Sequence, residues 1–242
     1  MPITNITVTE NKELPKKLNP IKERMDIYIP GIPNGLSRRN GMIYVLCGSG
    51  GSGKTCLLLN LFKSRNLYRN KFHNIFYFCP SSSFCSVEKH PFEKHDKVYH
   101  ELTVEALEGI YQFLVGVKES GEIEYSCVII DDFASTLKET DVQIQLNKML
   151  IKARHLQCGF IFTLQGYLYF PKMLRKQITY ITLFKTNNAE EWAIIAKELL
   201  FLNKDDSLIL SEYVFDEPYN NLDVDTRDNI IYKNFELITL TK

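Results

Sequence analysis

One stretch of eight residues combines glycine, serine, lysine and threonine in an order that suits phosphate binding. It reads Gly48-Ser49-Gly50-Gly51-Ser52-Gly53-Lys54-Thr55. Glycines let backbone N–H groups turn towards phosphate oxygens, and the N-terminus of a following helix favours an anion. Lys54 is expected to reach the β- and γ-phosphates, and the Thr55 hydroxyl to bind Mg²⁺. The stretch therefore predicts a P-loop for ATP and Mg²⁺, in which residues 48–55 and the adjacent Cys56 bind the nucleotide.

The sequence on either side of this loop has the pattern that a P-loop requires. Residues 42–47 form a nearly continuous apolar run, which predicts a buried strand, and residues 57–62 are rich in leucine, as in a helix. A chance glycine-rich turn is the alternative interpretation. The strand–loop–helix setting argues against it, because a P-loop holds its phosphates at the start of a helix.

Two carboxylates follow another buried strand. The apolar run 127–130 ends at Asp131 and Asp132, and we expect this strand to lie next to the P-loop strand. Asp131 would then hold Mg²⁺, usually through a water, while Asp132 orients or deprotonates the attacking water. An ordinary strand-to-turn junction is the alternative. The spacing leaves room for one intervening strand, 74–79, an order typical of additional-strand, RecA-like ATPases rather than simple kinases.

Two further polar residues are candidates for a part in hydrolysis. Gln165 ends the strand 160–164, where a polar group can sense the γ-phosphate and the attacking water. Arg154 ends the preceding helix and is a candidate arginine finger for the ATP site of a neighbouring subunit, with Arg175 as its competitor. The ordinary alternatives are a polar residue that starts a loop, and a cation at the negative end of its own helix.

The rest of the chain alternates strand and helix patterns. A helix is predicted over 104–117 and is ended by Gly121, and Thr140-x-x-Gln143 resembles a capping box that opens another helix. The other expected elements are strands at 74–79, 160–164 and 180–184, a helix at 189–200, an exposed excursion at 81–97, an edge strand at 27–29, and short antiparallel strands at 208–210 and 230–238 around Asn234.

This order predicts an α/β fold, the RecA-like additional-strand P-loop NTPase, with a mostly parallel sheet and helices on both faces. A small antiparallel C-terminal extension completes it. We divide the chain into an N-terminal arm and loop (1–40), a P-loop ATPase core (41–200) and a C-terminal extension of the same domain (201–242).

Composition narrows the possible functions. Lys+Arg and Asp+Glu number 29 each, so attraction of nucleic acid would depend on local basic patches rather than on net charge. No apolar run approaches the ~20 residues of a membrane span, and no signal peptide is visible, so we expect a protein that is not secreted. Six cysteines without a Cys-x-x-Cys pair favour a reducing compartment. The spacing of Cys79, Cys85, His90 and His95 misses the usual structural-zinc patterns, so zinc is the less favoured interpretation.

Two other classes of nucleotide enzyme are disfavoured. Asn147-Lys148-Met149-Leu150 ends in leucine where a guanine-reading aspartate is required, and the residues after Asp131 lack the Asp-x-x-Gly switch of a GTPase. A nucleotide kinase would need an arginine-rich lid, which the sequence does not display.

With these residues placed, the chain resembles the poxvirus-type DNA-packaging ATPases of large DNA viruses and virophages, in the FtsK–HerA superfamily. The resemblance runs from about residue 42 to 200. It rests on residues 48–55, 74–80 and 129–132, and on Ala153-Arg154-His155-Leu156 leading to 160–165. Many superfamily members carry Asp-Glu where this chain has Asp131-Asp132.

The resemblance implies a ring-forming motor, hexameric or pentameric, that couples ATP hydrolysis to threading double-stranded DNA into a preformed capsid. Lys54, Asp132, Gln165 and Arg154 would be its catalytic residues, and Thr55 and Asp131 its Mg²⁺ ligands. It also implies capsid vertex proteins as partners, no membrane, and a place in the virion or in the viral factory of the host cytoplasm. DNA contacts in the pore would come from 81–97 or from 170–176, which contains Lys172, Arg175 and Lys176.

Three other functions stay open. A DNA-partition or regulatory P-loop ATPase would share the nucleotide site but would not translocate DNA. A binding module with a degenerate P-loop is disfavoured because Lys54, Thr55, Asp131 and Asp132 are all present. A host-type helicase or chromosome pump usually carries additional DNA-recognition domains, for which this chain has little room.

Overall fold

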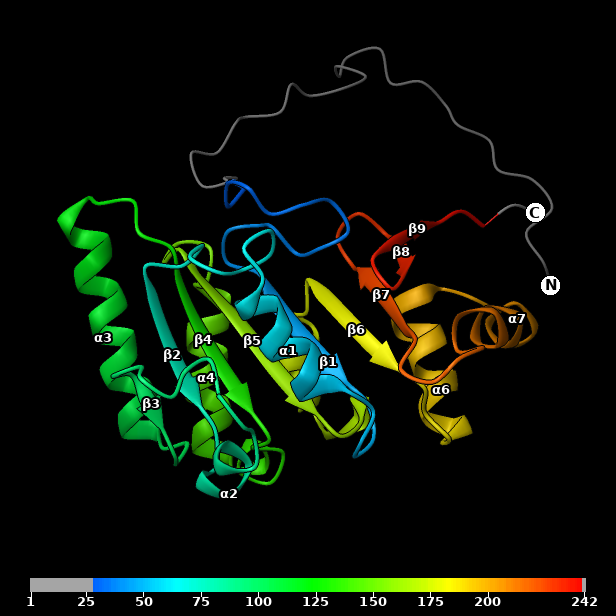
Figure 1. Ribbon diagram of the computed structural model, residues 1–242, viewed down its shortest axis with the longest axis horizontal. Coiled ribbons are helices and arrows are strands. Elements are labelled where there is room, and N and C mark those ends of the chain that lie inside the picture. The colour runs from blue at the N-terminus through cyan, green and yellow to red at the C-terminus, as the bar shows by residue number, and fades with distance from the viewer. Residues whose placement is uncertain (1–27, 241–242) are drawn as a thin grey trace, which may run out of the picture.

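The computed structural model describes residues 28–240, which build one nine-stranded sheet flanked by helices (Figure 1). The strands lie in the order β3-β2-β4-β5-β1-β6-β7-β8-β9. Their bounds are β1 (Ile43–Cys47), β2 (Asn74–Phe78), β3 (Val98–Tyr99), β4 (Ser126–Asp131), β5 (Cys158–Leu164), β6 (Tyr180–Phe184), β7 (Asn221–Asp225), β8 (Ile230–Lys233) and β9 (Glu236–Ile238). The helices are α1 (Lys54–Lys63), α2 (Ser81–Cys85), α3 (Val104–Ser120), α4 (Thr140–Ile151), α5 (Lys172–Arg175), α6 (Ala189–Ile195) and α7 (Lys204–Val214), with short turns η1 (Thr136–Lys138), η2 (Tyr167–Tyr169) and η3 (Ala196–Leu200).

Strand direction confirms the predicted fold class. Strands β1 to β6 run parallel to their neighbours, whereas β7, β8 and β9 pair antiparallel beyond β6. The carboxyl ends of β1, β4 and β5 therefore meet at one edge of the sheet, at the bottom of Figure 1. This is the edge where an open α/β sheet binds its ligands.

The prediction that the strand ending at Asp131 lies directly beside the P-loop strand was wrong. β5, not β4, pairs with β1, with Val45 opposite Phe162, and β4 pairs with the far side of β5. The intervening strand is therefore β5, whereas β2, which spans most of the predicted 74–79, lies beyond β4. Chain order alone could not tell which of the two strands is inserted, because both are short apolar runs.

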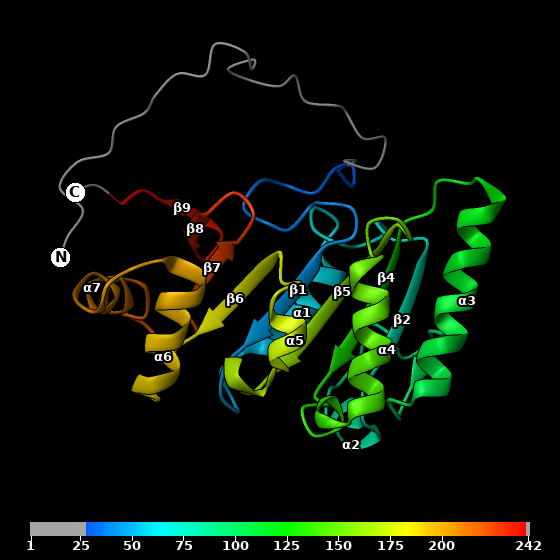
Figure 2. The ribbon, with the colours of Figure 1, turned by 180° about the vertical axis from the view of Figure 1, so that it is seen from behind.

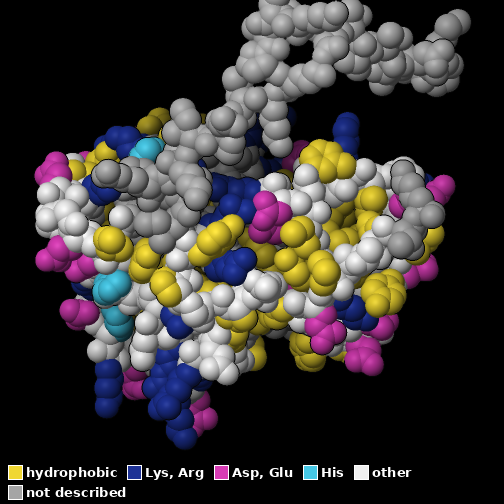
Figure 3. All heavy atoms as spheres, turned by 90° about the horizontal axis from the view of Figure 1, so that it is seen from above, with side chains coloured by type: hydrophobic (Ala, Val, Ile, Leu, Met, Phe, Trp, Pro, Cys, Tyr) yellow, Lys and Arg dark blue, Asp and Glu magenta, His cyan; other side chains and the backbone are white. Residues whose placement is uncertain are grey.

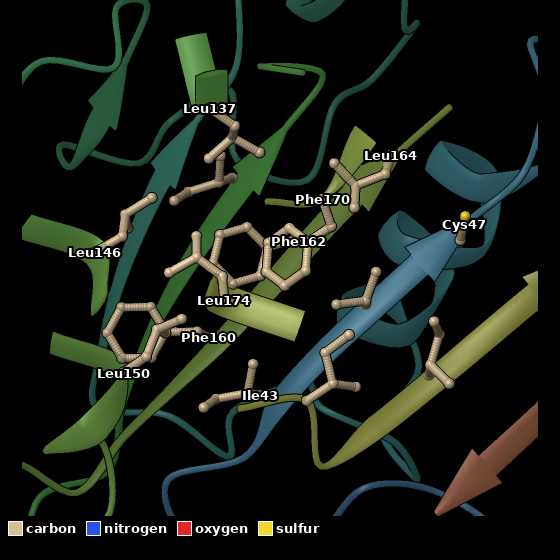
Figure 4. Packing of buried hydrophobic residues seen from close by; sticks show 14 of the residues in the cluster. Ile43, Cys47, Leu137, Leu146, Leu150, Phe160, Phe162, Leu164, Phe170 and Leu174 are labelled. Atoms are coloured by element: carbon tan, nitrogen blue, oxygen red, sulfur yellow. The ribbon is translucent and has the colours of Figure 1, made fainter. Parts of the chain in front are cut away.

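Helices cover both faces of the sheet because alternate residues of each strand point to opposite faces. Tyr44 and Leu46 of β1 join the cluster under α1, whereas Val45 joins the cluster under α3 and α4. Figure 2 shows α3, α4 and α5 on the face opposite α1. In that layer the rings of Phe162 and Phe170 lie 4.9 Å apart and pack with residues of α4 and α5 (Figure 4).

Local sequence signals explain both ends of α3 but not the start of α4. Thr103 caps α3 by accepting from the Ala106 N–H, and Gly121 ends it with a φ of 77°, as predicted, because glycine adopts this left-handed conformation without strain. The proposed capping box was wrong. Thr140 is the first residue of α4, and Glu139 precedes it without a side-chain cap.

The C-terminal region holds one confirmed element and one error. β8 and β9 form an antiparallel pair around Asn234, as predicted. Residues 208–210 were expected to be a strand but lie in α7, whose first turn is capped by Asn203 and carries Asp205 and Asp206. Three consecutive apolar residues suggested a strand. The buried residues of this helix are instead Ser207, Leu210 and Val214, which have the spacing of one helix face.

The segment 81–97 is less exposed than expected. His90 and Phe92 are buried, and the ring of Phe92 lies 4.7 Å from that of Tyr77 in β2. The segment therefore packs on the sheet near its carboxyl edge. At the other end of the chain, Tyr28 forms an isolated antiparallel bridge with Arg39, and Ile29, Ile32 and Leu36 of the predicted arm and loop are buried. Residues 1–27 of that segment lie outside the described residues.

A buried polar network joins the parallel and antiparallel parts of the sheet. The Tyr44 hydroxyl lies 2.8 Å from that of Thr182, which donates to Asp223 of β7. The Phe235 N–H donates to the other carboxylate oxygen of Asp223 at 2.9 Å. Each buried polar group of this network thus has a hydrogen-bond partner, which offsets the cost of removing the group from water.

We predict that the turn before β1 requires glycine at position 41. Gly41 has a φ of 68°, and an added Cβ would lie 2.4 Å from the Cα of Arg154. Gly41→Ala should therefore lower the free energy of unfolding, measured in urea, by about 1–3 kcal/mol. Gly116→Ala is the control, since that glycine lies within α3 with open space around its Cα. It should raise the free energy of unfolding by about 0.4–1 kcal/mol. Equal stability of the two variants would contradict the prediction.

Candidate active site

The P-loop leads from β1 to α1 at the carboxyl edge of the sheet. The Gly48 N–H donates to the Leu164 carbonyl of β5 at 3.0 Å, which fixes where the loop begins. A Cβ on Gly48 would lie 2.7 Å from the Cβ of Phe184, so no larger residue fits there. Gly53 precedes α1 with a φ of 100°, a conformation that glycine adopts without strain. Glycine at positions 48 and 53 therefore permits the tight strand-to-helix turn that a P-loop requires.

Lys54 lies across this loop. Its ammonium group donates to the carbonyls of Gly48 at 2.6 Å and Ser49 at 2.8 Å. Burial lowers its pKa, while the nearby charges of Asp132 and Asp131 act in the opposite direction. The cation is thus held between the glycine-rich loop and the two carboxylates, where phosphate oxygens would lie.

Asp131 is buried and held by two hydroxyl groups. Only 1% of the residue is exposed. The Tyr77 hydroxyl donates to one oxygen at 2.9 Å, and the Thr163 hydroxyl donates to the other. Burial raises the pKa of Asp131, and Asp132 adds to this effect, while the two hydroxyl groups and Lys54 lower it. A buried carboxylate held in this way could serve, with the Thr55 hydroxyl, as one of the oxygen ligands that Mg²⁺ prefers.

Asp132 lies on the exposed side of the same junction, in a left-handed conformation with a φ of 63°. Its N–H donates to the Thr163 hydroxyl at 3.1 Å. Its carboxylate accepts from Ser83 of α2 at 3.0 Å and from the Gln165 amide at 3.5 Å. The structure thus brings together Asp132 and Gln165, the two residues predicted to handle the attacking water.

Several residues of this region were missed by the sequence analysis. Ser83 and Tyr77 contact the aspartates, and Thr163 contacts both of them. The signal for Thr163 was a single hydroxyl residue within an apolar strand. The signal for Ser83 was a serine cluster directly after β2. Neither signal is specific without the strand order.

Arg154 lies at the opposite edge of the sheet. It precedes the first residue of β5, whereas Gln165 follows the last, so the two ends are separated by the length of a seven-residue strand, or about 20 Å. With His155 and Arg227 it lines a cavity of about 270 Å³ at this edge. Figure 3 looks onto this face and shows Lys and Arg side chains near its middle. The structure therefore does not bring Arg154 to the P-loop of its own subunit.

Arg175 has a different role within its own chain. Its guanidinium donates to the carbonyls of Phe170 at 2.8 Å and Leu168 at 2.9 Å, and lies 4.8 Å from the ring centre of Tyr167. These contacts hold the loop that follows Gln165. The competing candidate for an arginine finger is thus engaged in local structure.

The weak zinc candidate gains no support from the geometry. Within residues 28–240, no group of three or more His, Cys, Asp or Glu side chains could hold a metal ion. His90 instead accepts from the Phe92 N–H at 3.2 Å and lies 3.4 Å from the Tyr77 hydroxyl.

The fold and this loop define a RecA-like P-loop ATPase. A family profile described as "Poxvirus A32 protein" matches residues 36–214, and the chain belongs to this family of poxvirus-type packaging ATPases. A comparison with curated protein sequences found no match.

Solved structures share the fold at low sequence identity. The DNA-packaging ATPase B204 of Sulfolobus Turreted Icosahedral Virus is 19% identical, with a TM-score of 0.59 over 83% of this chain and 98% of that one. The B204 of Sulfolobus turreted icosahedral virus 2, in complex with AMPPCP, is 18% identical, with a TM-score of 0.56 over 84% and 100%. EssC (ATPases 2 and 3) from Geobacillus thermodenitrificans is 17% identical, with a TM-score of 0.58 over 81% and 40%.

No helix within residues 28–240 is both long enough and apolar enough to cross a membrane.

We predict that Thr163 favours the ionised form of Asp131. Burial raises the pKa of Asp131, and the hydrogen bond from the Thr163 hydroxyl lowers it. Thr163→Val removes this bond and should therefore raise the pKa further. If catalysis requires the carboxylate, the acidic limb of the pH profile of ATP turnover should move to higher pH, and turnover at neutral pH should fall. The control is Thr182→Val, because that buried hydroxyl contacts Tyr44 and Asp223 instead. An unmoved acidic limb in Thr163→Val would refute the prediction.

Proposed function

We propose that the protein is an ATP-hydrolysing motor that acts as a ring oligomer and translocates double-stranded viral DNA into a preformed capsid. The observation that carries this proposal is the meeting of Lys54, Asp131, Asp132 and Gln165 at one edge of a RecA-like sheet, in a member of the poxvirus A32 family. Its partners would be DNA, the capsid vertex proteins and further copies of the chain. It would act in the virion or in the viral factory of the host cytoplasm.

Each residue has a distinct task in the proposed reaction. The backbone of residues 48–55 and the Cys56 N–H would bind the phosphates, and Lys54 would stabilise charge on the β- and γ-phosphates. Thr55 and Asp131 would hold Mg²⁺, which draws charge away from the phosphates. Asp132 would accept a proton from the attacking water or orient it, and Gln165, 3.5 Å away, would position the same water.

Arg154 would act on a neighbouring subunit. It lies beyond the amino end of β5, at the edge of the sheet opposite to the P-loop. This separation from its own ATP site supports a role at the ATP site of another copy. An arginine delivered in trans stabilises charge in the transition state and makes hydrolysis depend on the neighbour. Subunits of a ring could then fire in order.

DNA contacts are proposed for the segment that follows Gln165. Lys172 and Lys176 are exposed at the ends of α5, and the adjacent Tyr169 is also exposed. These few exposed cations would hold the phosphate backbone and release it again, which fits a chain of zero net charge. The segment 81–97 is the other candidate, and its buried His90 and Phe92 make it the less favoured one.

We predict that ATP turnover depends on linear double-stranded DNA and on neighbouring subunits. Lys54→Ala and Asp132→Asn should each lower turnover by about 100-fold or more. Arg154→Ala should lower it by about 1,000-fold or more. An equimolar mixture of Lys54→Ala and Arg154→Ala should recover part of the activity, because some interfaces then pair an intact P-loop with an intact arginine.

The matched control is a mixture of Lys54→Ala and Asp132→Asn. Both defects lie in the ATP site of the same subunit, so this mixture should stay inactive. Recovery in both mixtures, or in neither, would contradict a finger in trans. Turnover indifferent to DNA would favour the regulatory or partition ATPase instead.

We predict that the double variant Lys172→Ala/Lys176→Ala loses DNA-stimulated turnover while turnover without DNA stays within about twofold. Arg175 is left intact because its guanidinium holds the backbone of its own loop. The matched control is Lys118→Ala/Lys204→Ala, at two exposed lysines of α3 and α7 that lie outside both candidate segments. Intact DNA stimulation in the Lys172/Lys176 variant would move the proposed DNA contact to another segment.

A further inference from the structure

Two adjacent cavities lie on the β6–β7 side of the P-loop. The larger, about 680 Å³, is lined by Lys54, Thr55 and Asn60 of α1 and by Phe184, Tyr219 and Asn221. The smaller, about 450 Å³, lies against the other side of the loop and shares Gly51, Phe184 and Tyr219 with it. A volume of 300–1,000 Å³ is typical of a site for a small molecule. The cavities thus continue from the phosphate-binding loop towards the C-terminal part of the sheet.

Two aromatic side chains border this space from the C-terminal side of the chain. Tyr219 is 71% exposed, and its ring edge would lie 3.4 Å from a Cβ placed on Gly53. Phe184 is buried at the end of β6, with its ring edge 3.7 Å from the same position. An aromatic ring exposed at the mouth of a cavity offers a flat apolar face on which another ring can stack.

Tyr219 is held in this position by the C-terminal hairpin. Asn234, in the turn between β8 and β9, accepts from the Asn221 N–H at 3.0 Å and donates to the Asn220 side chain at 2.8 Å. Asn220 in turn donates to Asp216 at 2.7 Å, and Lys233 donates to the same carboxylate at 2.7 Å. Tyr219 itself has a φ of 67°, which is unusual for a residue other than glycine, asparagine or aspartate. The surrounding bonds therefore fix a strained residue beside the P-loop.

We infer that the segment 215–221 is the base-binding part of the nucleotide site, in which the Tyr219 ring stacks on the purine of ATP and Phe184 forms the base of the pocket. The C-terminal hairpin then serves to position this segment. The inference rests on the proposed function, because it names a further part of the same ATP site. It adds a specificity-determining residue that lies far from the P-loop motif in the chain.

The test compares a ligand that has a base with one that has none. Isothermal titration calorimetry with Mg²⁺ would measure the affinity for AMP-PNP and for inorganic tripolyphosphate. Tyr219→Ala should weaken AMP-PNP binding by roughly 10-fold or more, in line with the loss of base–aromatic stacking, and should change tripolyphosphate binding by less than about twofold. Tyr219→Phe keeps the ring and should bind both ligands as the wild type does.

Tyr28→Ala is the matched control. Tyr28 is 46% exposed beside Arg39 and lines neither cavity, so its removal should leave both affinities unchanged. Unchanged AMP-PNP binding in Tyr219→Ala would overturn the inference. Equal weakening of both ligands would also overturn it, because the residue would then support the phosphate site or the fold.

A second measurement uses the wild-type protein and does not depend on how a variant folds. Photolabelling with 8-azido-ATP should attach to the peptide that contains Tyr219, and excess ATP should prevent the labelling. Attachment elsewhere would overturn the inference. Failure of the wild type to bind AMP-PNP or tripolyphosphate would instead refute the proposed ATPase function, and the base site with it.

Discussion

The insertion of β5 between β1 and β4 is the constraint on which the rest of the site depends. Parallel pairing on both sides aligns the carboxyl ends of the three strands, with Leu164 opposite Cys47 and Thr163 opposite Asp131. The register therefore decides that the P-loop, the two aspartates and Gln165 share one edge. It also places Arg154, before the first residue of β5, at the other edge. A shift by one residue would turn each side chain of the strand to the opposite face.

The Thr163 hydroxyl shows how one group serves two neighbours. It donates to Asp131 and accepts from the N–H of Asp132. A carboxylate taken out of water is costly unless hydrogen bonds replace its hydration, and the second hydroxyl, from Tyr77, completes this replacement. The Asp131 carboxylate is thereby held in one orientation, while Asp132 keeps its carboxylate on the exposed side. Two successive aspartates thus acquire different environments from a single strand end.

The sequence was sufficient for the fold class, and it singled out a P-loop and two aspartates that the structure places at one edge of the sheet, because these signals are local. Gly48 to Thr55 form one continuous motif, and Asp131 and Asp132 follow directly from an apolar strand. The insertion of β5 was not predictable in this way, since strand order depends on packing between distant segments. Tyr219 was missed because it lies in a polar loop without a motif, and β7 because its alternating aspartates hide the strand. Residues 208–210 were misassigned because three apolar residues fit a strand and a buried helix equally well.

The buried carboxyl group of Asp223 makes the junction of the two parts of the sheet sensitive to protons. Burial raises its pKa to about 7, against the effect of the bonds from Thr182 and Phe235. Between about pH 4 and pH 7 the unfolded chain has lost this proton while the folded chain still holds it, so the folded state is stabilised by acid at this position and the contribution falls as the pH rises. Most carboxylates in ion pairs have a lowered pKa in the folded state, so their contribution to stability rises with pH instead. Near neutral pH, the folded protein therefore contains Asp223 in both its protonated and its ionised form, next to the hairpin that holds residues 220 and 221.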